Sequence, residues 1–357
     1  MSETTSSSNA PHVVFGEGSL QKLPGEIARM DWSRAMIVST PGRAALTEKV
    51  EALLGNRVAA VFDRAQVHVP ERVAASARRM SEDAQADVIV ALGGGSAIGV
   101  AKAVALTSDI PIVAVPTTYG GSEMTPIWGL TTDGVKETGR DQRVMPRVVI
   151  YDPDLTLSLP ARVTACSGLN AMAHCIEALY APNVSARVME PALEGLKALA
   201  SSLVRLAAAP NDREQRREAM RGAMLAGFAL GNAQMALHHK LCHSLGGAFD
   251  LPHAETHAVL LPYTAAYNRD AAPDAMRAAA KALGVEDTPI ELLSIAMTID
   301  APRALREIGM KESDTERATS VAMEKQYPNP AELTREKIRV LLEAACHGDA
   351  QYVTDFA

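Results

Sequence analysis

Histidines are concentrated in one short stretch of this chain. Five of the nine lie between His238 and His257, within the segments ALHHKLCHSLGG and LPHAETH. Imidazole rings are costly to bury among Ala and Leu unless they bind or donate to something. This stretch is therefore the expected chemical centre of the protein.

A second signal comes earlier, in the segment SGLNAMAHCIE. Asn170 and His174 are four residues apart, so on a helix both side chains project from one face. A carboxylate at 170 would complete a metal site, but asparagine offers only a neutral carbonyl oxygen, and iron or zinc gains affinity from anionic or strongly basic ligands. The sequence therefore predicts a site with no metal. The alternative stays open, because a site made of three histidine ligands and no carboxylate can still hold zinc.

A glycine-rich turn favours a phosphate site. Residues 87–92, DVIVAL, predict a buried strand, and Gly93, Gly94, Gly95 and Ser96 then lead into a helical pattern. Glycines let the main chain approach a ligand, and the helix start presents unpaired N–H groups. A dinucleotide pyrophosphate would fit there; the alternative is a turn that serves tight packing.

A hydroxyl-rich segment, PTTYGGSEMT at 116–125, follows the next predicted strand. Thr117, Thr118 and Ser122 suit a ribose or nicotinamide contact, and Tyr119 is a weaker candidate for a substrate contact. The alternative is an ordinary polar turn. Two such turns at neighbouring strand ends favour a dinucleotide more than either does alone.

The cofactor type stays open. After the first full strand, Ser39 and Thr40 are the expected cofactor contacts, and residues 39–43 contain no acid that would exclude a 2′-phosphate. Arg43 could assist such a phosphate or be an ordinary surface residue. The prediction is therefore NADH or NADPH.

Two domains must position these groups. Short β-branched runs alternate with helical patterns up to about residue 155, which predicts an α/β domain with a parallel sheet, residues 1–158. Helical periodicity dominates after Pro160 and predicts an all-α domain, residues 159–357, with the ligand in a cleft between the two.

Expected strands are 36–39, 58–62, 88–92, 112–115 and 148–151, with a further edge strand at 12–15. Expected helices include 42–54 and 71–85, and helix breaks are expected at Pro182, Pro191, Pro210, Pro252, Pro273, Pro302 and residues 327–330.

Composition narrows the class of protein. A formal net charge of −7, with no basic run, argues against a nucleic-acid partner. No apolar segment of membrane-spanning length and no signal segment occur, so we expect a cytoplasmic protein without a membrane partner. The four cysteines suggest no disulfide framework, and Cys242 is expected to be a packed core thiol rather than a reactive one.

The order of these motifs resembles the iron-containing alcohol dehydrogenase superfamily. The GGGS turn, the PTT segment with GSE, the helix with His174, the histidine run and the ProHis at 252–253 carry the resemblance over nearly the whole chain. Within that superfamily, HHKLCH and LPHAETH look like the maleylacetate reductases. This resemblance implies an iron-containing alcohol dehydrogenase-like or dehydroquinate synthase-like fold and a homodimer.

The resemblance also implies roles for single residues. Family metal ligands fall on Asn170, His174, His239 and His253, and a histidine near the substrate falls on His243. The cofactor phosphates fall on Gly94, Gly95 and Ser96, and a cofactor-contacting lysine falls on Lys136.

The implied activity is reduction of the conjugated double bond of maleylacetate, a small dicarboxylate, to 3-oxoadipate in the degradation of aromatic compounds. Without a metal, hydrogen-bond donors would have to support the enolate that hydride addition creates. We expect His243 to donate to that enolate, His174, His239 and His253 to bind carboxylates or act electrostatically, and Lys240 to make a secondary carboxylate contact. Asn170 is expected to contact the substrate. His238 and His257 are expected to be core rings with backbone partners.

Three alternatives stay open. The first is a metal-dependent alcohol or polyol dehydrogenase of the same superfamily that tolerates Asn170 as a neutral ligand. The second is a lyase similar to dehydroquinate synthase, which would need a well-held zinc and more basic residues than this histidine region offers. The third is a dinucleotide sensor, which would have no need of converging histidines.

Overall fold

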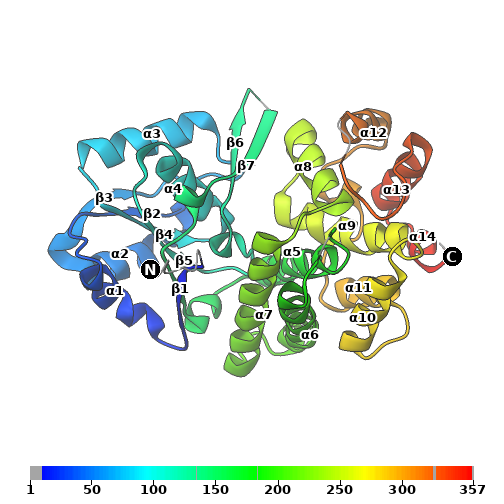
Figure 1. The fold of residues 1–357 in the computed structure, drawn as a ribbon, viewed down its shortest axis with the longest axis horizontal. Helices are drawn as coiled ribbons and strands as arrows, with labels where there is room; N and C mark the ends of the chain where they lie inside the picture. The colour runs from blue at the N-terminus through cyan, green and yellow to red at the C-terminus, as the bar shows by residue number, and fades with distance from the viewer. Residues whose placement is uncertain (1–9, 134, 183, 325–326, 356–357) are drawn as a thin grey trace, which may run out of the picture. The chain divides into compact units, whose positions relative to one another are not determined.

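The chain folds into two compact units. The structure is a computed structural model that describes residues 10–133, 135–182, 184–324 and 327–355. The first unit comprises the chain up to residue 116 together with 123–129 and 138–152, and the second comprises 117–122, 130–137 and the chain from 153 onward. Figure 1 shows the α/β character of the first unit and the helical character of the second.

A parallel six-stranded sheet forms the centre of the first unit. The strand order is β1-β8-β5-β4-β2-β3, and every pairing is parallel. The inner strands are buried along their whole length, as expected when helices cover both faces of a sheet. The strands are β1 (His12–Phe15), β2 (Ala35–Val38), β3 (Val58–Phe62), β4 (Val88–Gly93), β5 (Ile112–Pro116) and β8 (Val148–Tyr151).

Four helices cover this sheet: α1 (Leu23–Arg29), α2 (Ala44–Leu54), α3 (Glu71–Asp83) and α4 (Gly95–Ser108). Right-handed crossovers place α3 and α4 on one face and α2 on the other, and α3 contacts α4 while α1 contacts α2 (Figure 1). The chain runs from β2 outward to β3 in one direction and from β4 to β5 in the other. The carboxyl ends of β2 and β4 therefore flank the point where the strand order reverses, the usual ligand position in such sheets.

A small second sheet was not foreseen from the sequence. It pairs β6 (Ile127–Thr132) with β7 (Val135–Arg140). Both strands are short and partly exposed, so they lack the apolar pattern of the central strands. Gly139 fits under Trp128, because a Cβ at that glycine would lie 2.7 Å from the indole ring.

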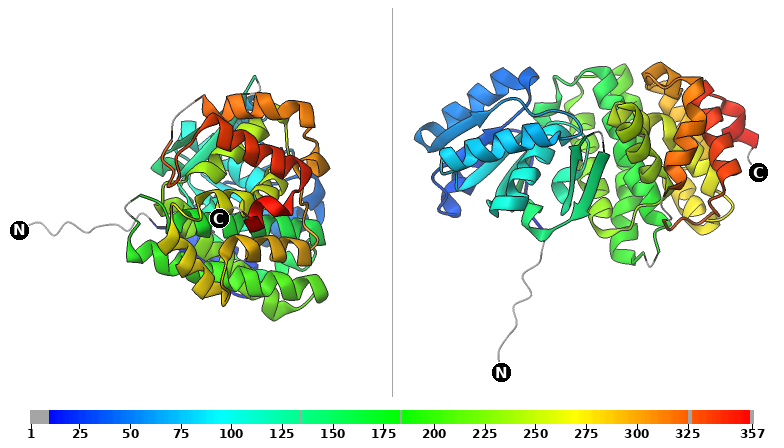
Figure 2. Two further views of the ribbon diagram at one scale, coloured as in Figure 1. Left: turned by 90° about the vertical axis from the view of Figure 1, so that its right-hand side faces the viewer. Right: turned by 90° about the horizontal axis from the view of Figure 1, so that it is seen from above.

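The second unit is a bundle of helices around α5, which is buried from Thr164 to Leu179. Helix α5 contacts α6, α7 and α9, and α8 packs against α9 and α12 (Figure 2). The helices are α5 (Ala161–Leu179), α6 (Ala186–Ala208), α7 (Arg213–Asn232), α8 (Leu237–Phe249), α9 (His253–Asn268), α10 (Pro273–Leu283), α11 (Thr288–Thr298), α12 (Thr315–Met323), α13 (Arg335–His347) and α14 (Ala350–Asp355). In the part of the chain that the structure describes, no helix combines the length and apolar character needed to cross a membrane.

The predicted fold class is confirmed, including β1 as an edge strand. The helix break predicted at Pro191 is wrong, because Pro191 lies inside α6. It stands in the second turn and removes only the hydrogen bond that residue 191 would donate to the Arg187 carbonyl, so the remaining turns of this 23-residue helix hold it together. Pro252 and Pro273 stand where predicted, at the starts of α9 and α10.

Candidate active site

The turn between β4 and α4 has the geometry of a phosphate site. Gly93 has a φ of +147°, and a Cβ there would lie 3.1 Å from the Cβ of Ala97. Gly94 is the N-cap of α4, and it offers no side chain to accept the first N–H groups of the helix. Those donors are thus available to an anion beside the strand reversal.

Ser39 and Thr40 follow β2 on the other side of that reversal. Ser39 is fully buried, and its Oγ accepts a hydrogen bond from Thr47 Oγ1 at 3.0 Å, so its side chain holds α2 in place. Thr40 is the extended residue before the short helical turn 41–43. Their contact with a cofactor stays a prediction.

The hydroxyl-rich segment 117–122 belongs to the second unit. Thr117 is buried, and its Oγ1 has no hydrogen-bond partner among the described residues. Tyr119 is also buried, and its hydroxyl accepts from Arg216 Nη1 at 3.2 Å. The same guanidinium donates to Thr164 Oγ1 at 2.9 Å, which ties the segment to α5 and α7.

Gly121 brings this segment against α7 and against α5, the helix that carries His174. Its φ is +78°, and a Cβ would lie 2.9 Å from Gly227 Cα and 3.3 Å from His174 Nδ1. Only glycine allows this close approach of the main chain to α5 and α7.

Six imidazoles from three helices form one cluster. His174 of α5 stacks on His239 of α8, with ring centroids 5.0 Å apart. His257 of α9 lies 4.9 Å from His239 and 4.5 Å from His253. His243, one turn after His239, stacks on His253 at 6.0 Å. The histidines of the predicted site therefore do converge, and His238 completes the group at 4.8 Å from His257.

Glu177 fixes the orientation of His239. The Glu177 carboxylate is almost fully buried and lies 2.5 Å from His239 Nδ1. It also accepts the backbone N–H groups of His238 at 2.8 Å and of Ala236 at 3.2 Å, at the start of α8. With its Nδ1 facing Glu177, His239 is left with Nε2 for a ligand, the arrangement typical of metal-binding histidines.

Several polar atoms of the cluster are buried without a hydrogen-bond partner in the described part of the chain. They are Asn170 Oδ1, His174 Nδ1, His239 Nε2 and His257 Nε2. Leaving such atoms buried and unpaired is costly, so their convergence indicates that they bind something. Nitrogen lone pairs together with an amide oxygen form a donor set that suits a divalent transition metal.

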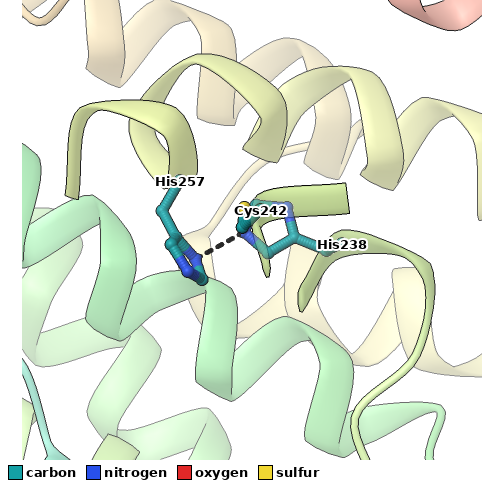
Figure 3. A group of neighbouring side chains, drawn as sticks. All are labelled: His238, Cys242 and His257. Atoms are coloured by element: carbon teal, nitrogen blue, oxygen red, sulfur yellow. Dashed lines mark hydrogen bonds between the residues drawn. The ribbon is translucent and has the colours of Figure 1, made fainter. Parts of the chain in front are cut away.

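A second group of possible metal ligands shares two residues with this cluster. His238, Cys242 and His257 offer atoms within 4.8 Å of one another, and all three residues are buried. Figure 3 shows the three side chains pointing toward one another from α8 and α9. His238 Nε2 lies 2.9 Å from His257 Nδ1 and 3.8 Å from the Cys242 sulfur.

Burial keeps these groups uncharged. Desolvation, reinforced by the neighbouring imidazoles, holds the pKa values of His174 and His257 well below their usual range. Desolvation together with the Lys136 charge does the same to the pKa of His243. Burial lowers the pKa of His238 to about 3 and raises the pKa of the Cys242 thiol well above its usual value. Neutral imidazole is the form that binds a metal, whereas binding a carboxylate by charge would need imidazolium.

The two lysines of the predicted site have different surroundings. Burial lowers the pKa of Lys136, whose charge acts on Cys242 and His243. The Lys240 ammonium instead lies over the ring of Tyr327, 5.9 Å from its centroid. The cofactor role predicted for Lys136 and the carboxylate role predicted for Lys240 both stay predictions.

Comparison with known proteins identifies the family. A model described as iron-containing alcohol dehydrogenase matches residues 10–153, and one for the C-terminal part of the Fe-containing alcohol dehydrogenase family matches residues 164–346. The chain belongs to the iron-containing alcohol dehydrogenase family. It is therefore an oxidoreductase.

Relatives within this family are similar over almost their whole length. A protein of Pseudomonas knackmussii named maleylacetate reductase is 49% identical, with 95% of this chain and 96% of that protein covered. A crystal structure of maleylacetate reductase from Agrobacterium tumefaciens has a TM-score of 0.90 at 43% identity, covering 95% of this chain and 97% of that one. A structure of a putative alcohol dehydrogenase from Ralstonia eutropha JMP134 has a TM-score of 0.94 at 46% identity, covering 96% and 97%.

The prediction that no metal is needed is wrong. The chain belongs to an iron-containing family, and it holds residues that could bind a metal. The prediction gave too much weight to the missing carboxylate at Asn170. Neutral imidazole nitrogens are good ligands in themselves, and His257, which was expected to be a core ring, lies 4.9 Å from His239 and 4.5 Å from His253.

Two residues of the site were missed in the sequence. Glu177 stands three residues after His174 and seven after Asn170, so it shares their helical face, a spacing that could have revealed it. Thr264 lies in a stretch of ordinary helical pattern, but its Oγ1 is 2.9 Å from His238 Nδ1. His238 thus has side-chain partners, not the backbone partner that was expected.

Proposed function

We propose that this protein is a maleylacetate reductase, which transfers hydride from NADH or NADPH to the conjugated double bond of maleylacetate and so forms 3-oxoadipate. The observation that carries the proposal is the 49% identity over 95% of the chain to a protein of that name. The converging imidazoles are the chemical centre that such a reaction needs.

The phosphates of the cofactor are assigned to the first unit. The β4–α4 turn offers free backbone donors to a pyrophosphate, and Ser39 and Thr40 stand beside it across the strand reversal. Thr117, Thr118 and Ser122 are assigned to the ribose and nicotinamide. We propose that a boundary near residue 158 separates this cofactor-binding part from the catalytic helices.

Asn170, His174, His239 and His253 would hold the metal, and it would act as a Lewis acid toward the substrate. Glu177 keeps His239 Nε2 available, since the ring's other nitrogen faces the carboxylate. The stacking of His174 on His239 and of His253 on His243 limits the rotation of these rings. The chain thus presents its donor atoms already ordered, which lowers the entropic cost of binding.

We assign His243 as the group that donates a proton to the enolate. Addition of hydride to the double bond leaves an enolate, which must take up one proton to give the product. His243 and His253 are partly exposed, whereas His174 and His239 are buried, so a substrate would reach His243 before the inner rings. A neutral imidazole N–H at that position can donate to the enolate, and the Lys136 charge nearby would support it.

Absorbance of the reduced nicotinamide tests this function. Purified enzyme of measured metal content would be mixed with maleylacetate and with NADH or NADPH in turn, and turnover should depend on maleylacetate. Turnover with simple alcohols or polyols instead would favour the other dehydrogenase activity of the family. A homodimeric assembly and a cytoplasmic location remain predictions from the resemblance and the sequence.

A further inference from the structure

A buried chain of hydrogen bonds runs from Thr264 through His238 and ends at His257. Thr264 Oγ1 lies 2.9 Å from the Leu260 carbonyl and 2.9 Å from His238 Nδ1. His238 Nε2 in turn lies 2.9 Å from His257 Nδ1 (Figure 3). The three side chains belong to residues that are at most 1% exposed, so solvent does not compete for these bonds.

The threonine determines which atom is the donor in each hydrogen bond of this series. A threonine hydroxyl carries one proton, and in a helix it commonly donates to the carbonyl four residues earlier, here that of Leu260. Thr264 Oγ1 must then accept the proton of His238 Nδ1. A neutral imidazole has only one N–H, so His238 Nε2 is a lone pair and accepts from His257 Nδ1.

His257 is thereby left with a lone pair on Nε2. This atom is buried, and it has no hydrogen-bond partner among the residues that the structure describes. Its ring lies 4.9 Å from that of His239 and 6.2 Å from that of His174. His239 Nε2 and His174 Nδ1 are likewise buried without a hydrogen-bond partner among the described residues.

We propose that His257 is a further metal ligand through Nε2, and that Thr264, acting through His238, selects the tautomer that makes this possible. The inference rests on the metal site assigned above and extends it. A fifth donor compensates for the neutral amide at position 170, because an imidazole nitrogen binds iron or zinc more strongly than an amide oxygen does. His238 is then a positioning residue, and Thr264 is another.

Metal affinity is the measurement that separates this proposal from the proposed reaction. The enzyme would be stripped with a chelator, and its affinity for zinc would be measured by competition with a chromophoric chelator, without substrate or nicotinamide. Thr264→Val removes the acceptor and keeps the shape, and it should weaken zinc binding about 10–100-fold, the usual effect of losing an outer-shell partner. Thr264→Ser should bind zinc as the wild type does.

A matched control is Thr319→Val. Thr319 is a fully buried helical threonine that donates to the carbonyl four residues earlier, but no imidazole contacts its hydroxyl in the described structure. This variant should leave zinc affinity unchanged. His257→Leu should weaken zinc binding at least as much as Thr264→Val, and nitrogen-15 spectra of the metal-free wild type should show His257 protonated at Nδ1.

Three results would overturn the proposal. One is unchanged zinc affinity in both Thr264→Val and His257→Leu. Another is a spectrum with His257 protonated at Nε2, which would mean that the chain runs in the opposite direction. The third is a thiolate charge-transfer band in cobalt-loaded enzyme that Cys242→Ser abolishes, because the metal would then lie in the His238, Cys242 and His257 group. None of these results depends on whether maleylacetate is the substrate.

Discussion

Replacing Glu177 by glutamine should weaken both metal binding and stability. Glu177 Oε2 accepts from both His239 Nδ1 and the Ala236 N–H, and Oε1 accepts from the His238 N–H. Glutamine keeps a single acceptor oxygen and turns an NH₂ group toward the remaining donors. With the amide oxygen in the place of Oε2 the variant loses the bond from the His238 N–H, and in the other orientation it loses those from His239 Nδ1 and the Ala236 N–H.

The size of the effect follows from burial. A hydrogen bond to a charged group contributes about 1.5–3 kcal/mol, so the loss of one or two bonds amounts to about 1.5–6 kcal/mol. Removing a buried charge recovers part of this, since burial alone would raise the pKa of Glu177, although His239 and the backbone donors hold that pKa below its usual value. We expect a net loss of about 1–4 kcal/mol in the free energy of unfolding, and zinc binding that is weaker by about 10–100-fold because a neutral amide replaces the carboxylate behind His239.

Chemical denaturation and chelator competition would measure these two quantities on the same preparations. Glu194→Gln is the matched control, because the Glu194 side chain is 66% exposed and its carboxylate lies 3.6 Å from the Arg221 guanidinium. Its free energy of unfolding should stay within about 0.5 kcal/mol of the wild type. If Glu177→Gln behaved like the Glu194 variant in both assays, Glu177 would have no role in orienting His239.

Further predictions concern the approach of the 117–122 segment, a buried lysine and the proton donor. Gly121→Ala should destabilise the protein by about 1–3 kcal/mol and lower turnover, because the residue has a positive φ and its Cβ would meet Gly227; Gly120→Ala, with its nearest atom 3.8 Å away, should be nearly neutral in the same melts. Burial lowers the pKa of Lys102 to about 7, so between there and the unfolded value of 10.5 the unfolded chain binds a proton that the folded chain lacks. The unfolding free energy of the wild type relative to Lys102→Met should therefore rise with pH across that window, and a flat difference would contradict the assigned shift. His243→Ala should lower kcat about 10²–10⁴-fold with little change in NADH affinity, whereas equal loss of both in a folded variant would remove His243 from the proton step.

The sequence predicted the elements whose signals are local. Runs of β-branched residues predicted the parallel strands, and the glycines after β4 predicted the turn that opens α4. Pro191 shows the limit of such rules, because a proline near a helix start costs one hydrogen bond and a long helix tolerates it. The β6–β7 pair was missed because its strands are polar and partly exposed.

The site was only partly predictable for a different reason. The histidines were conspicuous by type and spacing, but their partners are distant in the chain: Glu177 is 62 residues from His239, and Thr264 is 26 from His238. A glutamate or threonine at an ordinary helical position carries no mark of such a contact. The metal was misjudged because one ligand position, Asn170, was considered without the packing that gathers further nitrogens around it.

The destination of the hydride tests the central claim most directly. NADH carrying deuterium at the transferred position would be consumed with maleylacetate, and the product would be examined by NMR and mass spectrometry. The account predicts 3-oxoadipate with one deuterium on a carbon of the former double bond and an intact ketone. Deuterium on a carbinol carbon, with the double bond retained, would contradict it and would make the enzyme a carbonyl reductase of the alcohol dehydrogenase type.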